Sequence, residues 1–353
     1  MSTIVEARGL VKTYKRPDGT EVQAVRGIDL DIKKGEVFSL LGPNGAGKTT
    51  TISMISGLLA PTSGDAKIGG FSITKQPMEA KRLLGVVPQE IALYPRLSAR
   101  QNLEFFGKMY GLYGKDLAAA VDEVLDFTDL KDRQKDQVDT FSGGMKRRVN
   151  IGVGLLHKPE LVYMDEPTVG VDPQSRRRIL DTVIRLRDER KMTVLYTTHL
   201  MEESQELSNR VGIVDHGQMI AMGTVGELIQ KVGEEDRLVL SVGDQKIGDD
   251  LLAKFQTVTG VTHAEYKAVD IAAEPDESGT LKVDKTASGT FKSVGNAQAT
   301  DGKITIYATR GRKALPEVLR IADDAGVEVL SVEVREPDLE AVFLHLTGRE
   351  LRD

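Results

Sequence analysis

The sequence contains no cysteine and no long run of apolar residues. Without cysteine the chain can form no disulfide and can bind no metal through thiolates, which is compatible with a reducing compartment. No stretch approaches the roughly 18 to 20 uninterrupted apolar residues that a membrane-spanning helix needs. The first residues also lack the basic and then apolar layout of a signal peptide. These absences favour a cytoplasmic protein that does not itself cross a membrane.

Strong positive charge is also absent, because the formal net charge at pH 7 is -6. This balance argues against wholesale electrostatic binding of nucleic acid. Local basic clusters remain at residues 146–148 and 176–178, and we expect both to be solvated helix faces rather than anion contacts. With 353 residues, of which 28% are charged and 40% hydrophobic, the chain is long enough for about two globular domains.

A glycine-rich stretch is the first feature with a chemical meaning. Residues 42–49 fit the phosphate-loop pattern G-x-x-x-x-G-K-[ST] at every constrained position, between an apolar run that predicts a buried strand and a run that predicts a helix. The glycines let backbone N–H groups turn toward phosphates, and the helix amino terminus adds partial positive charge. Lys48 is then expected to reach the β- and γ-phosphates, and the Thr49 hydroxyl to hold Mg²⁺. The predicted phosphate-binding residues are Gly42, Pro43, Asn44, Gly45, Ala46, Gly47, Lys48, Thr49 and Thr50.

Two adjacent carboxylates end a second apolar run, Leu161–Pro167. Neighbouring side chains at a strand end diverge, so one carboxylate can face a metal and the other the γ-phosphate. We expect Asp165 to support Mg²⁺ through its water shell. Glu166 is expected to orient and deprotonate the attacking water, a general-base role worth about 10²- to 10⁴-fold in rate.

A second anion cradle is predicted at Ser142, Gly143 and Gly144. A serine hydroxyl, an unhindered backbone and a helix dipole can all point at one anion there. An ordinary helix cap is the alternative interpretation of this segment taken by itself.

These motifs in this order and spacing resemble the ATP-binding cassette of ABC transporters, over about residues 4–232. The resemblance implies two cassettes facing head to tail, with each ATP between the phosphate loop of one copy and the serine-glycine segment of the other. By position it further implies that Tyr14 stacks on adenine, that Gln89 senses Mg²⁺ and water, and that Asp172 crosses the dimer. It also implies that His199 contacts the γ-phosphate and holds the attacking water with Glu166.

The subfamily is indicated by departures from the common LSGGQ signature, where Phe141 and Met145 replace leucine and glutamine. With the closing segment 337–349, this pattern looks like the type-2 ABC exporters, including drug pumps of the daunorubicin-resistance kind. The resemblance implies separately encoded transmembrane permease subunits, a second copy of the chain as partner, and a peripheral position on the cytoplasmic face of the membrane. We expect the permease contact at Gln89 and the following Ile91, Leu93 and Tyr94.

The domain organisation follows from the pattern of elements. Alternating strands and helices predict an α/β cassette with a mixed sheet over residues 1–232, and a helical subdomain lies at about 90–160. Residues 233–353 spell β-α-β-β-α-β, which predicts a smaller α+β, ferredoxin-like domain with a polar insertion at about 270–302. The insertion is not explained by the resemblance. An amphipathic helix at 337–346 closes the chain.

Rival functions stay open at this point. One is a polysaccharide or lipid exporter with a substrate-binding or regulatory tail, and another is an importer ATPase with a regulatory domain. A soluble ABC ATPase outside transport is less compatible, because the chain has one cassette without a long coiled-coil split. The transported substrate is not determined by this sequence.

Overall fold

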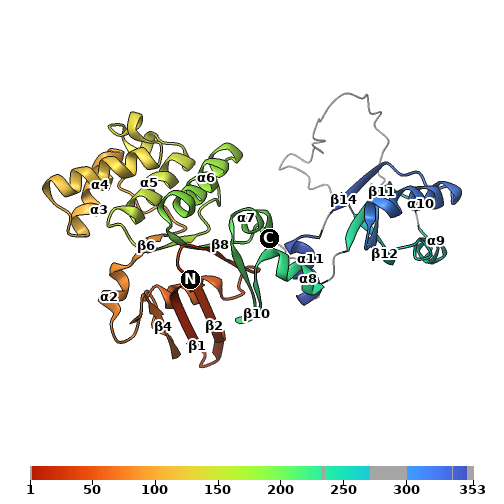
Figure 1. Cartoon of the computed structure of the whole chain (residues 1–353), viewed down its shortest axis with the longest axis horizontal. Helices are drawn as coiled ribbons and strands as arrows, with labels where there is room; N and C mark the ends of the chain where they lie inside the picture. The colour runs from red at the N-terminus through yellow and green to blue at the C-terminus, as the bar shows by residue number, and fades with distance from the viewer. Residues whose placement is uncertain (1, 233–234, 246, 271–299, 336, 348–353) are drawn as a thin grey trace. The chain divides into compact units, whose positions relative to one another are not determined.

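The structure is a computed structural model and describes residues 2–232, 235–245, 247–270, 300–335 and 337–347 (Figure 1). It divides into two compact units. The first unit comprises the chain up to Val232 together with the chain from Leu339, and the second runs from Gly233 to Asp338.

The first unit begins with an antiparallel sheet whose strand order is β2-β1-β4-β5. Its two long strands pair along most of their length, and their inward side chains form a core with α1. The strands are β1 (Thr3–Lys15), β2 (Glu21–Lys33), β4 (Ser63–Ile68) and β5 (Phe71–Ser72).

A second sheet of the first unit, with order β10-β9-β3-β8-β7-β6, carries the motifs. Its strands are parallel except for the edge strand β10. All residues of β3 and β7 are buried, as expected of parallel strands covered on both faces. The parallel register places the carboxyl ends of β3, β7 and β8 at one edge. The strands are β3 (Val37–Leu41), β6 (Leu84–Val87), β7 (Leu161–Asp165), β8 (Thr193–Thr198), β9 (Arg210–Asp215) and β10 (Gln218–Gly223).

Helices α3 to α6 gather on one side of the first unit (Figure 1) and share a core with β7 and β8. A capping box formed by Ser98 and Gln101 starts α3. α5 begins at Gly143, after a 3₁₀ turn at residues 138–140, and Ser142 caps the helix. The helices are α1 (Lys48–Ile55), α2 (Pro77–Arg82), α3 (Ala99–Met109), α4 (Gly114–Phe127), α5 (Gly143–Leu155), α6 (Pro173–Arg190), α7 (Met201–Leu207) and α8 (Val225–Val232), with a further 3₁₀ turn at Lys131–Arg133.

The closing helix, α11 (Leu339–Thr347), belongs to the first unit, whereas the sequence assigned it to the second domain. Leu339, Val342 and Phe343 are buried in an apolar cluster with Leu228 of α8. α11 also contacts α7, and it lies beside α8 in Figure 1. Periodicity reveals an apolar face on a helix but not the distant element that covers it, which is why the sequence misplaced this segment.

Phe343→Ala is expected to lower the free energy of unfolding of the first unit by about 3 kcal/mol or more, because the side chain is fully buried. Urea unfolding followed by a probe on the first unit measures the loss. His345→Ala, on the exposed face of the same helix, is the control and should change stability by less than about 0.5 kcal/mol. Equal effects of the two substitutions would contradict the packing of α11 on the first unit.

The second unit is a four-stranded antiparallel sheet, β12-β13-β11-β14, with two helices. Alternate residues of β11 and β13 share a core with both helices, so the helices cover the same face of the sheet. Of the predicted insertion, residues 271–299 lie outside the described residues, while its flanks continue β12 and β13. The elements are β11 (Asp236–Gly243), α9 (Asp249–Phe255), β12 (Val261–Asp270), β13 (Thr300–Ala308), α10 (Gly311–Asp324) and β14 (Ser331–Arg335).

Candidate functional site

The phosphate loop joins β3 to α1 at the carboxyl edge of the second sheet. Gly47 caps α1 with φ 100°, and a Cβ there would lie 2.6 Å from a backbone oxygen, so only glycine fits. No side chain caps this helix. Among the described residues, no hydrogen-bond acceptor pairs with the N–H groups of Lys48, Thr49 and Thr50. These free donors at a helix amino terminus suit an anion.

Lys48 is the buried cation of this loop, with 6% of its surface exposed. Its Nζ donates to the carbonyl oxygens of Gly42, at 2.5 Å, and of Pro43, at 3.2 Å. Burial lowers the pKa of the Lys48 ammonium, while the nearby carboxylates of Glu166 and Asp165 oppose that shift. The lysine therefore lies within electrostatic reach of both predicted acids.

The strand ends of β7 and β8 bring the predicted acids beside the predicted histidine. Glu166 follows β7 with φ 40°, an unusual backbone for a non-glycine residue, and its N–H donates to Thr197 Oγ1 at 3.0 Å. The Thr197 hydroxyl in turn donates to Asp165 Oδ1 at 2.8 Å. Nδ1 of His199 lies 3.4 Å from Glu166 Oε2 without forming a hydrogen bond. Sequence reasoning missed Thr197, whose hydroxyl fixes both acids across the strand pair.

The oxygen donors present fit Mg²⁺ held jointly with a nucleotide. The described residues contain no group of three or more His, Asp or Glu side chains that could hold a metal ion by themselves. Mg²⁺ commonly keeps several waters and binds through one or two protein oxygens plus substrate phosphates. Thr49, exposed at the start of α1, and Asp165, at the end of β7, carry oxygens of this kind.

The second predicted cradle starts α5, where Ser142 Oγ accepts a hydrogen bond from the N–H of Met145 at 3.3 Å. A Cβ on Gly144 would lie 2.1 Å from the Ser175 hydroxyl of α6, whereas one on Gly143 would lie 3.9 Å from the Gly170 carbonyl oxygen, an ordinary van der Waals contact. Among the described residues, no hydrogen bond or ion pair joins this cradle to the phosphate loop. Within one chain the two cradles are thus separate features.

Gln89 is exposed just after β6, and Arg147 holds its backbone. Arg147 of α5 is 4% exposed and donates to the carbonyl oxygens of Pro88, at 2.7 Å, and Gln89, at 2.6 Å. Arg148 is 6% exposed and donates to the carbonyl oxygen of Thr128 at 2.9 Å. The expectation that this basic cluster is a solvated face is therefore wrong for both arginines. The sequence of a basic cluster does not indicate which backbone carbonyl oxygens the fold will place beside its side chains.

The two remaining predicted residues occupy exposed positions. Tyr14, on β1, is 42% exposed, and Lys12 Nζ lies 5.5 Å from its ring centroid. The carboxylate of Asp172 caps α6 by accepting from the N–H of Ser175 at 2.9 Å. Hydrogen bonding by the Ser175 side chain, and after it this N–H bond, hold the pKa of Asp172 below its ordinary value. In the single chain, Asp172 therefore serves its own helix.

The comparison with protein families matches residues 25–169 to the family described as "ABC transporter". Relatives that match over the full length of the chain are also ATP-binding proteins by name. The chain is 44% identical to the linearmycin resistance ATP-binding protein LnrL of Bacillus subtilis, over 99% of this chain and 100% of the relative. It is 33% identical to the daunorubicin/doxorubicin resistance ATP-binding protein DrrA of Streptomyces peucetius, over 99% and 94%. It is 35% identical to the Nod factor export ATP-binding protein I of Cupriavidus metallidurans, over 100% of both.

Among solved structures, the dimeric post-hydrolysis state of the ATP-binding cassette MJ0796 bound to ADP and Pi matches with a TM-score of 0.57 and 26% identity. The match covers 63% of this chain and 98% of that one. None of the helices in the described part of the chain combines the length with the apolar composition of a membrane span. The sheet edge that carries the phosphate loop and the two acids, together with these full-length matches, shows that the chain belongs to the ATP-hydrolysing, ATP-binding subunits of ABC transporters.

Proposed function

We propose that the chain is the ATP-hydrolysing subunit of an exporter. The observation that carries the proposal is the convergence of Lys48, Glu166 and His199 at the carboxyl edge of one sheet. In the reaction, Glu166 takes a proton from the water that attacks the γ-phosphorus. The bond from phosphorus to the β-bridging oxygen breaks, and ADP and phosphate leave. His199 contacts the γ-phosphate and holds the same water, while Lys48 neutralises charge on the transferring group.

We assign the other nucleotide contacts to the remaining predicted residues. Tyr14 stacks on adenine, and the N–H groups of residues 45–50 bind the phosphates. Mg²⁺ would neutralise charge on the phosphates. Thr49 would hold it through its hydroxyl and Asp165 through water, and Gln89 would sense the metal and the attacking water. The unpaired amide donors of α1 and the Thr197 bond to Asp165 support these assignments.

The active form that we propose is a head-to-tail dimer. In it, Ser142, Gly143 and Gly144 of one copy close on the ATP held by the other, and Asp172 crosses the interface. Two features support this arrangement. The two cradles are unconnected within one chain, and the structural relative MJ0796 is described as dimeric with ADP and Pi bound. When the dimer closes on ATP, Asp172 would leave the N–H of Ser175, which it caps in the single chain, and contact the other copy.

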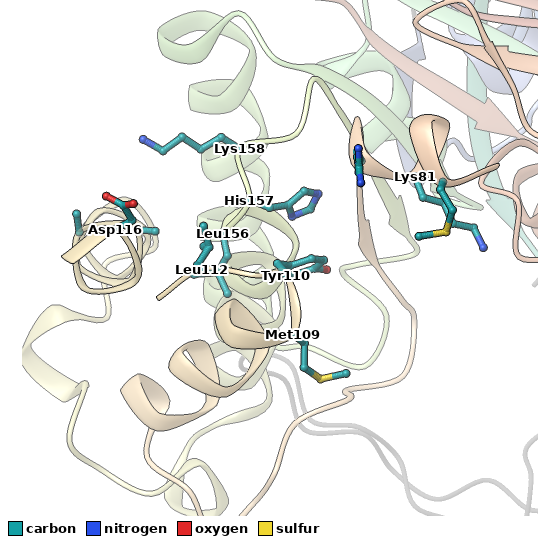
Figure 2. Close-up of a pocket in the computed structure, with 12 residues that line it drawn as sticks. Lys81, Met109, Tyr110, Leu112, Asp116, Leu156, His157 and Lys158 are labelled. Atoms are coloured by element: carbon teal, nitrogen blue, oxygen red, sulfur yellow. The ribbon is translucent and has the colours of Figure 1, made fainter. Parts of the chain in front are cut away.

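The proposed docking surface for a separately encoded membrane subunit starts beside Gln89. Tyr94 is 48% exposed and packs edge-on against Phe105 of α3, with ring centroids 4.7 Å apart. A hollow of about 800 Å³ lies at the end of α3, where Met109, Tyr110 and Lys81 of α2 line it (Figure 2). Arg147 of α5 hydrogen-bonds to the backbone of Gln89. Because α5 begins at the second cradle, Ser142–Gly144, a movement of the docking surface can be transmitted to that cradle. The chain would then lie on the cytoplasmic face of the membrane through this partner.

For the second unit we propose the ferredoxin-like fold. The β-α-β-β-α-β element order, the strand order β12-β13-β11-β14 and the antiparallel pairing all support it. This fold argues against an importer ATPase, whose regulatory domain is expected to be barrel-like. The substrate is set by membrane subunits outside this chain.

Copurification from native membranes tests the proposed function. We expect the tagged full chain to retain an integral membrane protein, and Phe105→Asp to lower its yield by about tenfold, because a charge would enter an apolar contact. Ile220→Asp is the matched control. Both residues are 38% exposed, and Ile220 lies on the edge strand β10, where a charged residue is well tolerated. Recovery without any membrane protein, or equal yields from both variants, would count against the docking surface.

A further inference from the structure

Glu203 is a buried carboxylate that the reaction described above does not use. It lies on α7, four residues after His199, and is 3% exposed. Its Oε2 accepts hydrogen bonds from three hydroxyl groups, each at 3.0 Å or less. They belong to Tyr196 (2.8 Å), Thr168 (3.0 Å) and Thr198 (3.0 Å). The other carboxylate oxygen lies 3.7 Å from Arg176 Nε.

The partners of Glu203 come from the segments that carry the candidate site. Thr168 stands two residues after Glu166, and Thr198 directly precedes His199. Arg176 lies in the first turns of α6, whose amino terminus is capped by Asp172. One carboxylate therefore joins the loop after β7, the end of β8 and the start of α6.

The physical chemistry of a buried charge makes this junction restrictive. Burying a carboxylate is costly unless hydrogen bonds and an opposite charge compensate it. Hydrogen bonds to an ionised acceptor are stronger than neutral ones, so each hydroxyl gains from staying on the same oxygen. A displacement of any one segment would leave Glu203 undercompensated, and the segments are thus held to a common geometry.

We propose that Glu203 is a positioning residue that fixes His199, Glu166 and the amino terminus of α6 relative to one another. It does not touch the nucleotide and acts through Thr168, Thr198 and Arg176. The inference rests on the proposed function for the roles of Glu166, His199 and Asp172. Glu203 lies outside the sequence motifs, and the proposed role accounts for a buried carboxylate on α7.

A second buried carboxylate of the first unit provides a matched control. Glu36 is 5% exposed, accepts from the N–H of Lys33 at 2.7 Å and pairs with Arg210 at 3.1 Å. It directly precedes β3, at the end of the strand opposite the phosphate loop. Glu36 and Glu203 therefore resemble each other in burial and pairing but differ in their distance from the candidate site along the sheet.

The experiment compares Glu203→Gln with Glu36→Gln in the full chain, by thermal unfolding and by kcat and KM for ATP. We expect kcat of Glu203→Gln to fall about tenfold or more while KM changes less than about twofold, because small misplacements of catalytic groups slow chemistry more than binding. Glu36→Gln should keep kcat within about twofold of the wild-type value, even if its thermal midpoint falls as far as that of Glu203→Gln. Equal falls in kcat for both variants, or a wild-type kcat for Glu203→Gln, would overturn the inference.

Thr168→Val and Thr198→Val keep the inference testable if Glu203→Gln does not fold, because each removes a single hydroxyl. Each should lower kcat, and the Thr168→Val/Thr198→Val double variant should lose less than the product of the two single losses, since coupled residues show non-additive effects. Full additivity would contradict the shared role. Measurements on the wild-type chain and on Glu166→Gln distinguish a failure of the proposed function from a failure of the proposal for Glu203. An inactive wild type would count against the proposed function, whereas a normal Glu203→Gln beside an inactive Glu166→Gln would count only against this inference.

Discussion

Glu166→Gln should bind ATP, hold a closed dimer and lose turnover by at least about 100-fold, because the amide cannot accept a proton from the attacking water. The substitution changes little else. The Glu166 N–H still donates to Thr197, and glutamine has nearly the shape of glutamate. The expected state is therefore an ATP-loaded dimer that cannot reopen. Steady-state phosphate release measures the loss, and light scattering with Mg²⁺ and ATP measures the dimer.

Glu160→Gln is the control for this substitution. Glu160 immediately precedes β7, at the end of the strand opposite Glu166, and forms an exposed ion pair with Lys34 at 2.6 Å. Exposed pairs contribute little, so this variant should keep wild-type turnover. Hydrolysis near the wild-type rate in Glu166→Gln would remove Glu166 from the role of general base.

A mixture of two inactive chains should regain activity if the second cradle works on the partner's nucleotide. Ser142→Asp keeps a good helix cap but places a negative charge against the γ-phosphate. Lys48→Met removes the phosphate-loop cation. In a mixed dimer, the Lys48→Met chain offers its intact signature to the intact phosphate loop of the other chain, so one complete site forms.

Random pairing makes half of the dimers mixed, so an equimolar mixture should reach about one quarter of wild-type turnover if the sites act independently. Each variant alone is the control and should show almost none. Titrating one variant into the other should trace a maximum near equal amounts. A mixture as inactive as its components would contradict the head-to-tail arrangement.

The candidate site was largely readable from the sequence because its parts are local patterns. The phosphate loop needs glycine at positions such as Gly47, where the backbone is left-handed and another chain segment lies close. The acids end an apolar run, and a buried parallel strand has that signature. Such features depend on residues near one another in the chain, so a single sequence carries them.

Interactions between distant segments were not readable in the same way. Arg147 resembles any cation in a surface helix until the carbonyls of Pro88 and Gln89 are folded against it. Thr197 is an ordinary strand residue until β7 pairs with β8. The role of Glu203 likewise depends on hydroxyl groups from two segments and on an arginine from a third.

The sequence by itself determined the family, the phosphate-loop motif and the alternation of strands and helices, because phosphate binding requires fixed residue types at fixed spacings. Only the tertiary structure decided which buried polar groups join those motifs and where the closing helix packs. The physical reason is that an apolar stripe such as that of α11, or a buried carboxylate such as Glu203, accepts any complementary partner. The folded sheet selects which partner is within reach.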